Sequence, residues 1–270
     1  MEHIASVLDS LSGFIRPITS NLPKPVEDLG IFLLDSEQCY NTLVRNADFV
    51  SSPECLSLGI SKGLSWGIVG MSSIVKIPQI LKLINSQSAE GISSSGYILE
   101  TLSYVITIAY NFRSQFPFST FGETVLITVQ NIIVTALLFL YSGKALYSAV
   151  FVALISAAFT VLIDNSEGGL VNHQILSYLQ ASTIFLNLFS KVPQVYSNWV
   201  NKSTGALSAF AVFNYLLGSL ARVYTTMKEV DDPIILASFL GSTVLNFILA
   251  LQVVQYWNAK VPNRKVAKKD

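Results

Sequence analysis

The chain has 270 residues, of which 51% are hydrophobic and only 13% are charged, and its formal net charge is zero. Soluble domains carry about 25% charged residues, so this composition excludes an ordinary soluble protein and predicts membrane helices. The balanced charge also argues against a nucleic-acid partner.

Residues suited to enzyme chemistry are sparse. The chain has two histidines, His3 and His173, and two cysteines, Cys39 and Cys55. They form no cluster with metal-ligand spacing, and no phosphate loop or nucleophile elbow is present. We therefore expect no catalytic activity, no metal and no cofactor.

The first part of the chain, residues 1–56, predicts an N-terminal arm. It is mixed in composition, and its prolines interrupt any long helix. The acidic Glu2 and the short apolar stretch after it do not fit a signal peptide, so we expect the first membrane helix to direct insertion.

Seven apolar segments follow, and each is predicted to form a helix that crosses the membrane. A crossing needs about 20 predominantly apolar residues. The third and fourth segments contain no charged residue. The predicted spans are approximately residues 58–84, 94–112, 124–143, 145–163, 174–199, 208–227 and 233–259.

One pattern occurs twice, in the first and the fifth of these spans. Lys-Ile-Pro-Gln at 76–79 returns as Lys-Val-Pro-Gln at 191–194. Proline removes a backbone hydrogen bond within a helix, and in a membrane neighbouring protein or water must replace it. Paired interruptions at matching positions of two halves point to the central site of a carrier.

The repeat predicts an all-α membrane protein with a 3+1+3 plan. Each repeat holds three helices, and a linker helix between them makes the two repeats parallel. The predicted domains are an arm at 1–56, the first repeat at 57–143, the linker helix and loop at 144–173, the second repeat at 174–259 and a basic tail at 260–270.

The loops predict the orientation. Basic residues gather on one side of the spans, which the positive-inside rule assigns to the cytosol, so the tail is cytosolic and the arm lumenal or external. Cys39 and Cys55 then share an oxidising compartment, where they either form a disulfide or remain free thiols. The sequon at 201–203 falls on the cytosolic side, and we expect it to carry no glycan.

Two Pro-Gln motifs in the first and fifth of seven spans resemble the PQ-loop superfamily, which includes the SWEET sugar transporters and the lysosomal cystine and cationic amino-acid exporters. Blocks around the motifs carry a more specific signal. They are Ser-Lys-Gly-Leu at 61–64, Ser-Ala-Glu-Gly-Ile-Ser at 88–93, Phe-Pro-Phe-Ser at 116–119, Gly-Glu at 122–123, Gly-Ser-Leu-Ala-Arg at 218–222 and Tyr-Trp-Asn-Ala-Lys at 256–260. Together they resemble the family of mannose-phosphate-dolichol utilisation-defect proteins, over approximately residues 38–262.

The resemblance implies a multi-pass protein of the endoplasmic-reticulum membrane without known catalytic activity. That family is needed for the use of mannose-phosphate-dolichol and glucose-phosphate-dolichol by lumenal glycosyltransferases, in N-glycan and glycosylphosphatidylinositol-anchor assembly. Some relatives end in a di-lysine retrieval signal. Here Lys268 is third from the end but Ala267 is fourth, which puts retrieval by that signal in doubt.

Polar residues and prolines inside the predicted spans are the candidate functional residues. Pro78 and Pro193 are either hinges that open the two repeats alternately or static kinks. Lys76 and Lys191 either bind a phosphate or extend their charges to the cytosolic surface. The predicted substrate-binding residues are Lys76, Lys191, Gln79, Gln194, Glu100, Asn187 and Asn214.

Other polar residues of the spans have competing interpretations. Glu100 either pairs with one of the two motif lysines, which we favour, or carries a proton. Arg222 is expected to extend to the lumenal surface. Asn187, Asn214 and Asn246 face either a pore or neighbouring helices, and polar contact between helices is the favoured interpretation.

Three classes of function remain open. The leading hypothesis is the use of dolichol-phosphate-linked mannose and glucose, through reorientation or presentation of the lipid-linked sugar. The alternatives are a carrier for a soluble sugar or amino acid and a non-transporting scaffold for glycosyltransferases. The expected partners are membrane lipid, dolichol-phosphate-linked sugars and, for the scaffold, glycosyltransferases.

Overall fold

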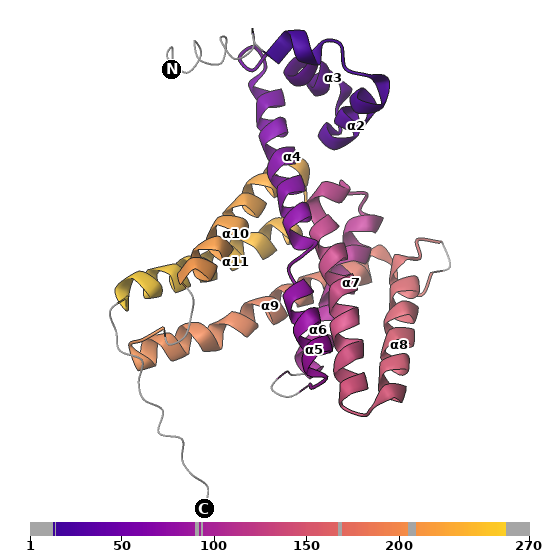
Figure 1. Cartoon of the computed structure of the whole chain (residues 1–270), viewed down its shortest axis with the longest axis vertical. Coiled ribbons are helices and arrows are strands. Elements are labelled where there is room, and N and C mark those ends of the chain that lie inside the picture. Colours follow the sequence, from indigo (N-terminus) through magenta and orange to yellow (C-terminus); the bar gives the residue numbers. More distant parts are fainter. Residues whose placement is uncertain are drawn as a thin grey trace, which may run out of the picture.

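A computed structural model describes residue 13 and residues 15–89, 92, 94–166, 169–204 and 209–257 (Figure 1). Within these ranges every regular element is a helix and no strand occurs, which confirms the predicted all-α class. The basic tail at 260–270, the histidine at position 3 and parts of the blocks at 88–93 and 256–260 lie outside the described residues.

The helices follow the predicted order along the chain. The arm contains α2, α3 and the π-helix η1, and the long helices run from α4 to α11. Their bounds are α2 Lys24–Leu34, α3 Glu37–Tyr40, η1 Asn41–Arg45, α4 Pro53–Ser72, α5 Ile77–Ser86, α6 Ser94–Arg113, α7 Phe118–Tyr141, α8 Ala145–Ile163, α9 His173–Asn201, α10 Ala209–Glu229 and α11 Pro233–Gln255.

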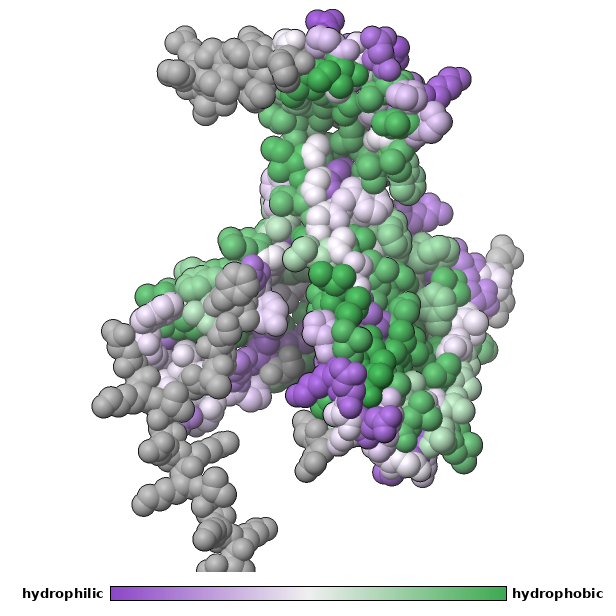
Figure 2. Space-filling model, in the orientation of Figure 1, coloured by the Kyte–Doolittle hydropathy of each residue, from purple (hydrophilic) through white to green (hydrophobic). Residues whose placement is uncertain are grey.

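Four helical segments of the described chain are long and apolar enough to cross a membrane: Pro53–Ser86, which joins α4 and α5, and the helices α7, α8 and α11. Figure 2 shows hydrophobic residues over the outward surfaces of the long helices, as contact with lipid requires. Helices α6, α9 and α10 have 20, 29 and 21 residues and are more polar. The seven-span plan stays a prediction.

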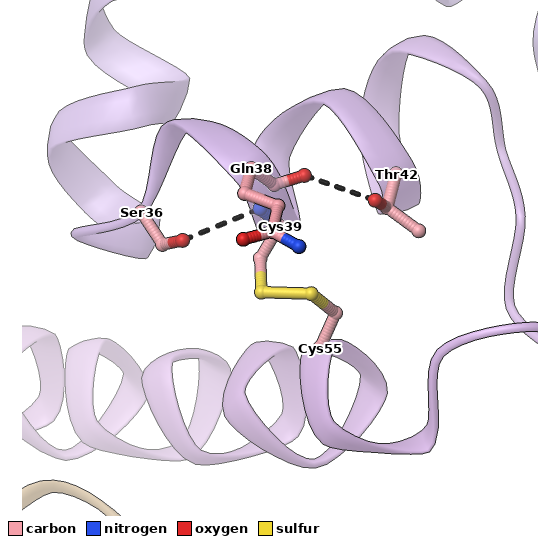
Figure 3. Close-up of a disulfide and its surroundings, with 5 residues drawn as sticks. All are labelled: Ser36, Gln38, Cys39, Thr42 and Cys55. Atoms are coloured by element: carbon pink, nitrogen blue, oxygen red, sulfur yellow. Dashed lines mark hydrogen bonds between the residues drawn. A yellow bond between two sulfur atoms is a disulfide. The ribbon is translucent and has the colours of Figure 1, made fainter.

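A disulfide ties the arm to the first long helix. Cys39 in α3 and Cys55 in α4 are bonded, with their Cα atoms 5.0 Å apart (Figure 3). Ser36 caps α3 by accepting a hydrogen bond from the backbone N–H of Cys39. Further along α4, the indole Nε1 of Trp66 donates to the carbonyl of Leu33 at 2.9 Å. The two cysteines are therefore paired, which resolves the alternatives that the sequence left open.

The first Pro-Gln motif breaks its helix. Helix α4 ends at Ser72, the backbone turns through residues 73–76, and α5 begins at Ile77 with Pro78 in its first turn. Proline is well tolerated there, because the N–H groups of a first turn have no acceptor within the helix. The first span is thus interrupted just before its proline, whereas Pro193 lies inside the continuous helix α9.

The long helices form two lobes, α5–α8 and α9–α11, that meet beside α4 (Figure 1). Helix α9 packs on α6, and α10 packs on α4. Buried Val105, Phe151 and Leu176 belong to one core that joins α6, α8 and α9. In Figure 1 the lobes diverge with distance from the arm, so the far ends of α9 and α11 lie well away from α5.

Candidate functional site

A cavity of about 930 Å³ lies between the two lobes. Helices α6 and α7 line it from one side and α9, α10 and α11 from the other, and Figure 2 shows hydrophilic residues in the hollow between the lobes. The volume falls within the roughly 300–1,000 Å³ typical of small-molecule sites. The lining includes two carboxylates, an amine, amides and several hydroxyls, among them Glu100, Glu123, Gln180, Asn187, Lys191 and Tyr215.

Three of the predicted binding residues, Glu100, Asn187 and Lys191, line this cavity. They come from both repeats, since Glu100 belongs to α6 and the other two belong to α9. The remaining predicted residues and the two prolines are not part of the lining; they are Lys76, Gln79, Gln194, Asn214, Pro78 and Pro193.

The first motif supports Glu100 from outside the cavity. Lys76 Nζ lies 3.4 Å from Glu100 Oε2, and the hydroxyl of Tyr104 donates to Glu100 Oε1 at 2.9 Å. Lys76 also lies over the ring of Tyr97, whose hydroxyl donates to Gln79 Oε1. Of the alternatives for Glu100, the structure therefore shows the ion pair, and Lys76 is already neutralised by a carboxylate.

The second motif has a different arrangement. Lys191 Nζ donates to Asn246 Oδ1 at 2.8 Å, and the Asn246 amide donates to Tyr215 O and Ser219 Oγ. In the part of the chain that the structure describes, no acid lies within ion-pair distance of Lys191. The two motif lysines are thus not equivalent. The amine of Lys191 enters the cavity with a neutral partner.

Two glutamines that the sequence analysis missed contact the motif helices. Gln130 in α7 bridges the break between α4 and α5: its Nε2 donates to Ser72 O at 2.9 Å, and its Oε1 accepts from the Lys76 N–H at 2.8 Å. In the second repeat, Gln252 in α11 donates to Val195 O at 2.9 Å. A buried amide in the third helix of each repeat was the available signal.

Buried charges cluster where α4, α7 and α10 meet, and one of them, Glu123, also lines the cavity. Lys62 Nζ and Glu229 Oε2 are 3.0 Å apart, and their side chains are only 5% and 1% exposed. Hydroxyls of Ser61, Ser65 and Ser119 also donate to the Glu229 carboxylate, at 2.5–3.2 Å. This carboxylate has four donors, so its burial is compensated.

A second buried pair adjoins the first. Arg222 in α10 pairs with Glu123 in α7, and it also donates to the Ser119 carbonyl at 3.3 Å. The expectation that Arg222 extends to the surface is wrong, because the acid on α7 gives the guanidinium a buried partner. On the arm side, Lys62 also lies 3.3 Å from Asp35, at the end of α2.

Most residues of this cluster fall in the sequence blocks at 61–64, 116–119, 122–123 and 218–222, whereas Ser65 and Glu229 lie outside them. The blocks indicated a family resemblance, but their contacts with one another could not be predicted. Glu229 lies just beyond the predicted span at 208–227, and its partners Ser61 and Ser119 lie more than 100 residues away in the sequence.

Comparison with known proteins identifies the repeats. Residues 60–120 and 175–235 match the family described as PQ loop repeat. The chain is also similar to solute carrier family 66 member 3 of Homo sapiens, with 22% identity over 192 residues that cover 71% of this chain and 92% of the relative. No solved structure matches. The chain therefore carries two PQ-loop repeats, is a distant relative of that solute carrier, and is a multi-pass membrane protein.

Proposed function

We propose that this PQ-loop membrane protein holds the polar head of dolichol-phosphate-linked mannose or glucose in its central cavity. It then reorients or presents that head for lumenal glycosylation at the endoplasmic reticulum. The observation that carries the proposal is Lys191, an amine that lines a cavity of about 930 Å³ and whose partner among the described residues, Asn246, is neutral. A lysine ammonium is a strong donor to phosphate.

The two motifs would then have separate roles. Lys191 receives the phosphate, while Glu100, held by Lys76 and Tyr104, accepts hydrogen bonds from sugar hydroxyls. Amides and hydroxyls of the lining suit the same polyol. The identity of the lipid-linked sugar comes from the sequence resemblance, and the cavity supplies groups of matching chemistry.

Reorientation needs a cavity that opens on alternate sides. The lobes diverge away from the arm (Figure 1), while the Lys62–Glu229 and Arg222–Glu123 pairs join them near the arm. Movement of one repeat against the other around a fixed site is the usual mechanism of carriers with internal repeats. If the cavity opened toward the arm, the two partners of each ion pair would therefore move apart.

The test is binding of a short-chain mannose-phosphate-dolichol analogue to the purified protein. We expect saturable binding that Lys191→Met weakens about tenfold or more, as the loss of a charged hydrogen bond implies. Lys76→Met should have a smaller effect. Lys202→Met is the matched control, because that lysine lies over Trp199 at the end of α9 and does not line the cavity. Absence of binding by the folded wild type would favour the scaffold.

A carrier of soluble solutes is the second candidate. It is favoured by the position of the cavity between the two repeats and by the relative that is named a solute carrier. Proteoliposomes without dolichol lipids distinguish the two functions. Uptake of a radiolabelled sugar or amino acid that depends on Lys191 would support the carrier. If the protein binds the dolichol analogue but takes up no solute, the carrier function is excluded.

A further inference from the structure

A second cavity, of about 450 Å³, lies at the turn between α6 and α7. Phenylalanines dominate its lining, together with one arginine and two amides. The lining residues are Phe112, Arg113, Gln115, Phe116, Phe118, Phe121 and Asn165. Phe121 also lines the central cavity, so it is part of the wall between the two.

Arg113 lies at the level of a membrane surface. It is the last residue of α6, and its Nη1 donates to the carbonyls of Leu162 and Val171 at 3.3 and 2.7 Å. Leu162 belongs to the last turn of α8, an apolar helix long enough to span the membrane. The end of such a helix meets the headgroup region, so the guanidinium lies where lipid phosphates are found.

The guanidinium is not fully used by the protein. Its Nε is buried and has no hydrogen-bond partner in the described ranges of the chain. Asp164 lies nearby: hydrogen bonds from Ser166 lower the pKa of its carboxyl first, and the charge of Arg113 lowers it further, yet no ion pair joins the two. Arg113 as a whole is only partly buried and lines the cavity, and a phosphate oxygen is the acceptor that arginine binds best.

Aromatic rings form the rest of the cavity. The rings of Phe118 and Phe121 meet edge to face with centroids 5.5 Å apart, and Phe118 lies 6.2 Å from Trp66. Phe118 packs over Gly122, where a Cβ would come within 2.7 Å of the ring. Phe112 is 56% exposed at the rim. An apolar chain that enters the cavity therefore meets ring surface on several sides.

We propose that this cavity binds a phosphate-bearing membrane lipid, with the phosphate against Arg113 and the first part of the chain against Phe112 and Phe118. The site is independent of the proposed function, because it lies outside the central cavity and needs no sugar. A lipid bound there would contact Phe121 and so adjoin the wall of the central cavity.

Trp66 provides the measurement, because its ring contacts Phe118. The full chain, with Trp199→Phe and Trp257→Phe to leave one tryptophan, is placed in phosphatidylcholine nanodiscs. A small fraction of the lipid is replaced by phosphatidic acid or phosphatidylcholine with brominated chains, which quench tryptophan on contact. We expect brominated phosphatidic acid to quench Trp66 at a mole fraction several-fold lower than brominated phosphatidylcholine.

Variants assign the preference to the cavity. Arg113→Gln should bring the two lipids to the same half-quenching fraction. Because Arg113 also holds two carbonyls, Phe112→Ala is the second variant, and its exposed ring can be removed without loss of the fold. Phe189→Ala, an exposed ring on α9, and Lys228→Gln, an exposed cation at the end of α10, should leave the preference unchanged.

Three results would overturn the proposal. Equal quenching by the two lipids in the wild type would mean that the aromatic rings only face the bilayer. Loss of the preference in Lys228→Gln would assign it to general surface charge. If inorganic phosphate alone changed Trp66 emission as much as phosphatidic acid does, the cavity would bind a soluble anion and not a lipid.

Discussion

At the scale of single residues, the cluster around Glu229 shows how a membrane protein holds charges in its interior. Lysine and three hydroxyls surround one carboxylate. Each donor comes from α4 or α7, while the acid comes from α10. A buried ion pair contributes modestly as a whole, but the loss of one partner is costly, because it leaves the other charge buried and unpaired.

We therefore predict that Glu229→Gln lowers stability by about 3–5 kcal/mol. Lys62→Met should do the same, while the double variant should lose much less than the sum of the two, since no lone charge remains. Thermal unfolding of the purified protein in detergent measures all three. Additive losses would show that the pair does not act as a unit.

Gln130 is the second critical residue, because its amide replaces hydrogen bonds that the broken helix lacks. Gln130→Leu leaves two backbone groups, of Ser72 and Lys76, without partners, each at a cost of about 1–3 kcal/mol if buried. Gln252→Leu is the matched control: it frees one backbone group, the Val195 carbonyl, together with the side-chain amide of Asn198, whereas both groups freed by Gln130→Leu belong to the backbone. We expect a larger decrease in the unfolding temperature for Gln130→Leu. Equal decreases would argue against this role.

At the scale of helices, the two motifs differ in what surrounds their prolines. Pro78 starts α5, while Pro193 lies inside α9 and removes a bond that its helix would otherwise form. Replacing a proline in the first turn of a helix, such as Pro78, changes few backbone hydrogen bonds. Replacing an interior proline, such as Pro193, by alanine lets the helix form one more backbone hydrogen bond.

Pro193→Ala is accordingly expected to increase amide-exchange protection across residues 189–197, with Pro78→Ala causing little change around 74–80. Hydrogen exchange followed by mass spectrometry resolves both segments. If the hinge hypothesis and the proposed function both hold, the stiffer Pro193→Ala variant also loses activity in glycan assembly. Equal changes in protection at both motifs would contradict the asymmetry.

The arm is the other element whose stability has a clear source. The Cys39–Cys55 disulfide closes a loop with a sequence separation of 16, for which the reduced entropy of the unfolded chain contributes about 3 kcal/mol. Replacing both cysteines by serine should make the arm, but not the long helices, sensitive to limited proteolysis. Simultaneous cleavage in both regions would show that the arm has no separate stability.

At the scale of the whole molecule, the disulfide supports a lumenal arm, because such bonds form in oxidising compartments. The sequon at Asn201, at the far end of α9, is then cytosolic and should carry no glycan. Asp48→Ser makes the exposed Asn46 of the arm an acceptor, which should be glycosylated in cells. A change in electrophoretic mobility after endoglycosidase treatment shows whether a glycan is present, and it tests both sites. A glycan at Asn201 would reverse the orientation.

The sequence predicted the helices well, because apolar length and proline position are local properties. It identified Lys191 and Glu100 as polar residues of the spans, and both line the cavity. It favoured an ion pair between Glu100 and one of the motif lysines but could not decide which, since partner choice depends on helix packing. It predicted an interruption at Pro78, but not the turn through residues 73–76 or its contact with Gln130 of α7, for the same reason.

The position of Lys62 connects the arm to the arrangement of the two repeats. Its amine is shared between Glu229, on the second repeat, and Asp35, on the arm. If the repeats separate and Glu229 withdraws, Asp35 is left as the ammonium's remaining acidic neighbour, so the arm is held more firmly when the lobes part. Linkage is reciprocal. An antibody that binds and stabilises the docked arm would therefore favour the separated lobes, although it does not contact the cavity.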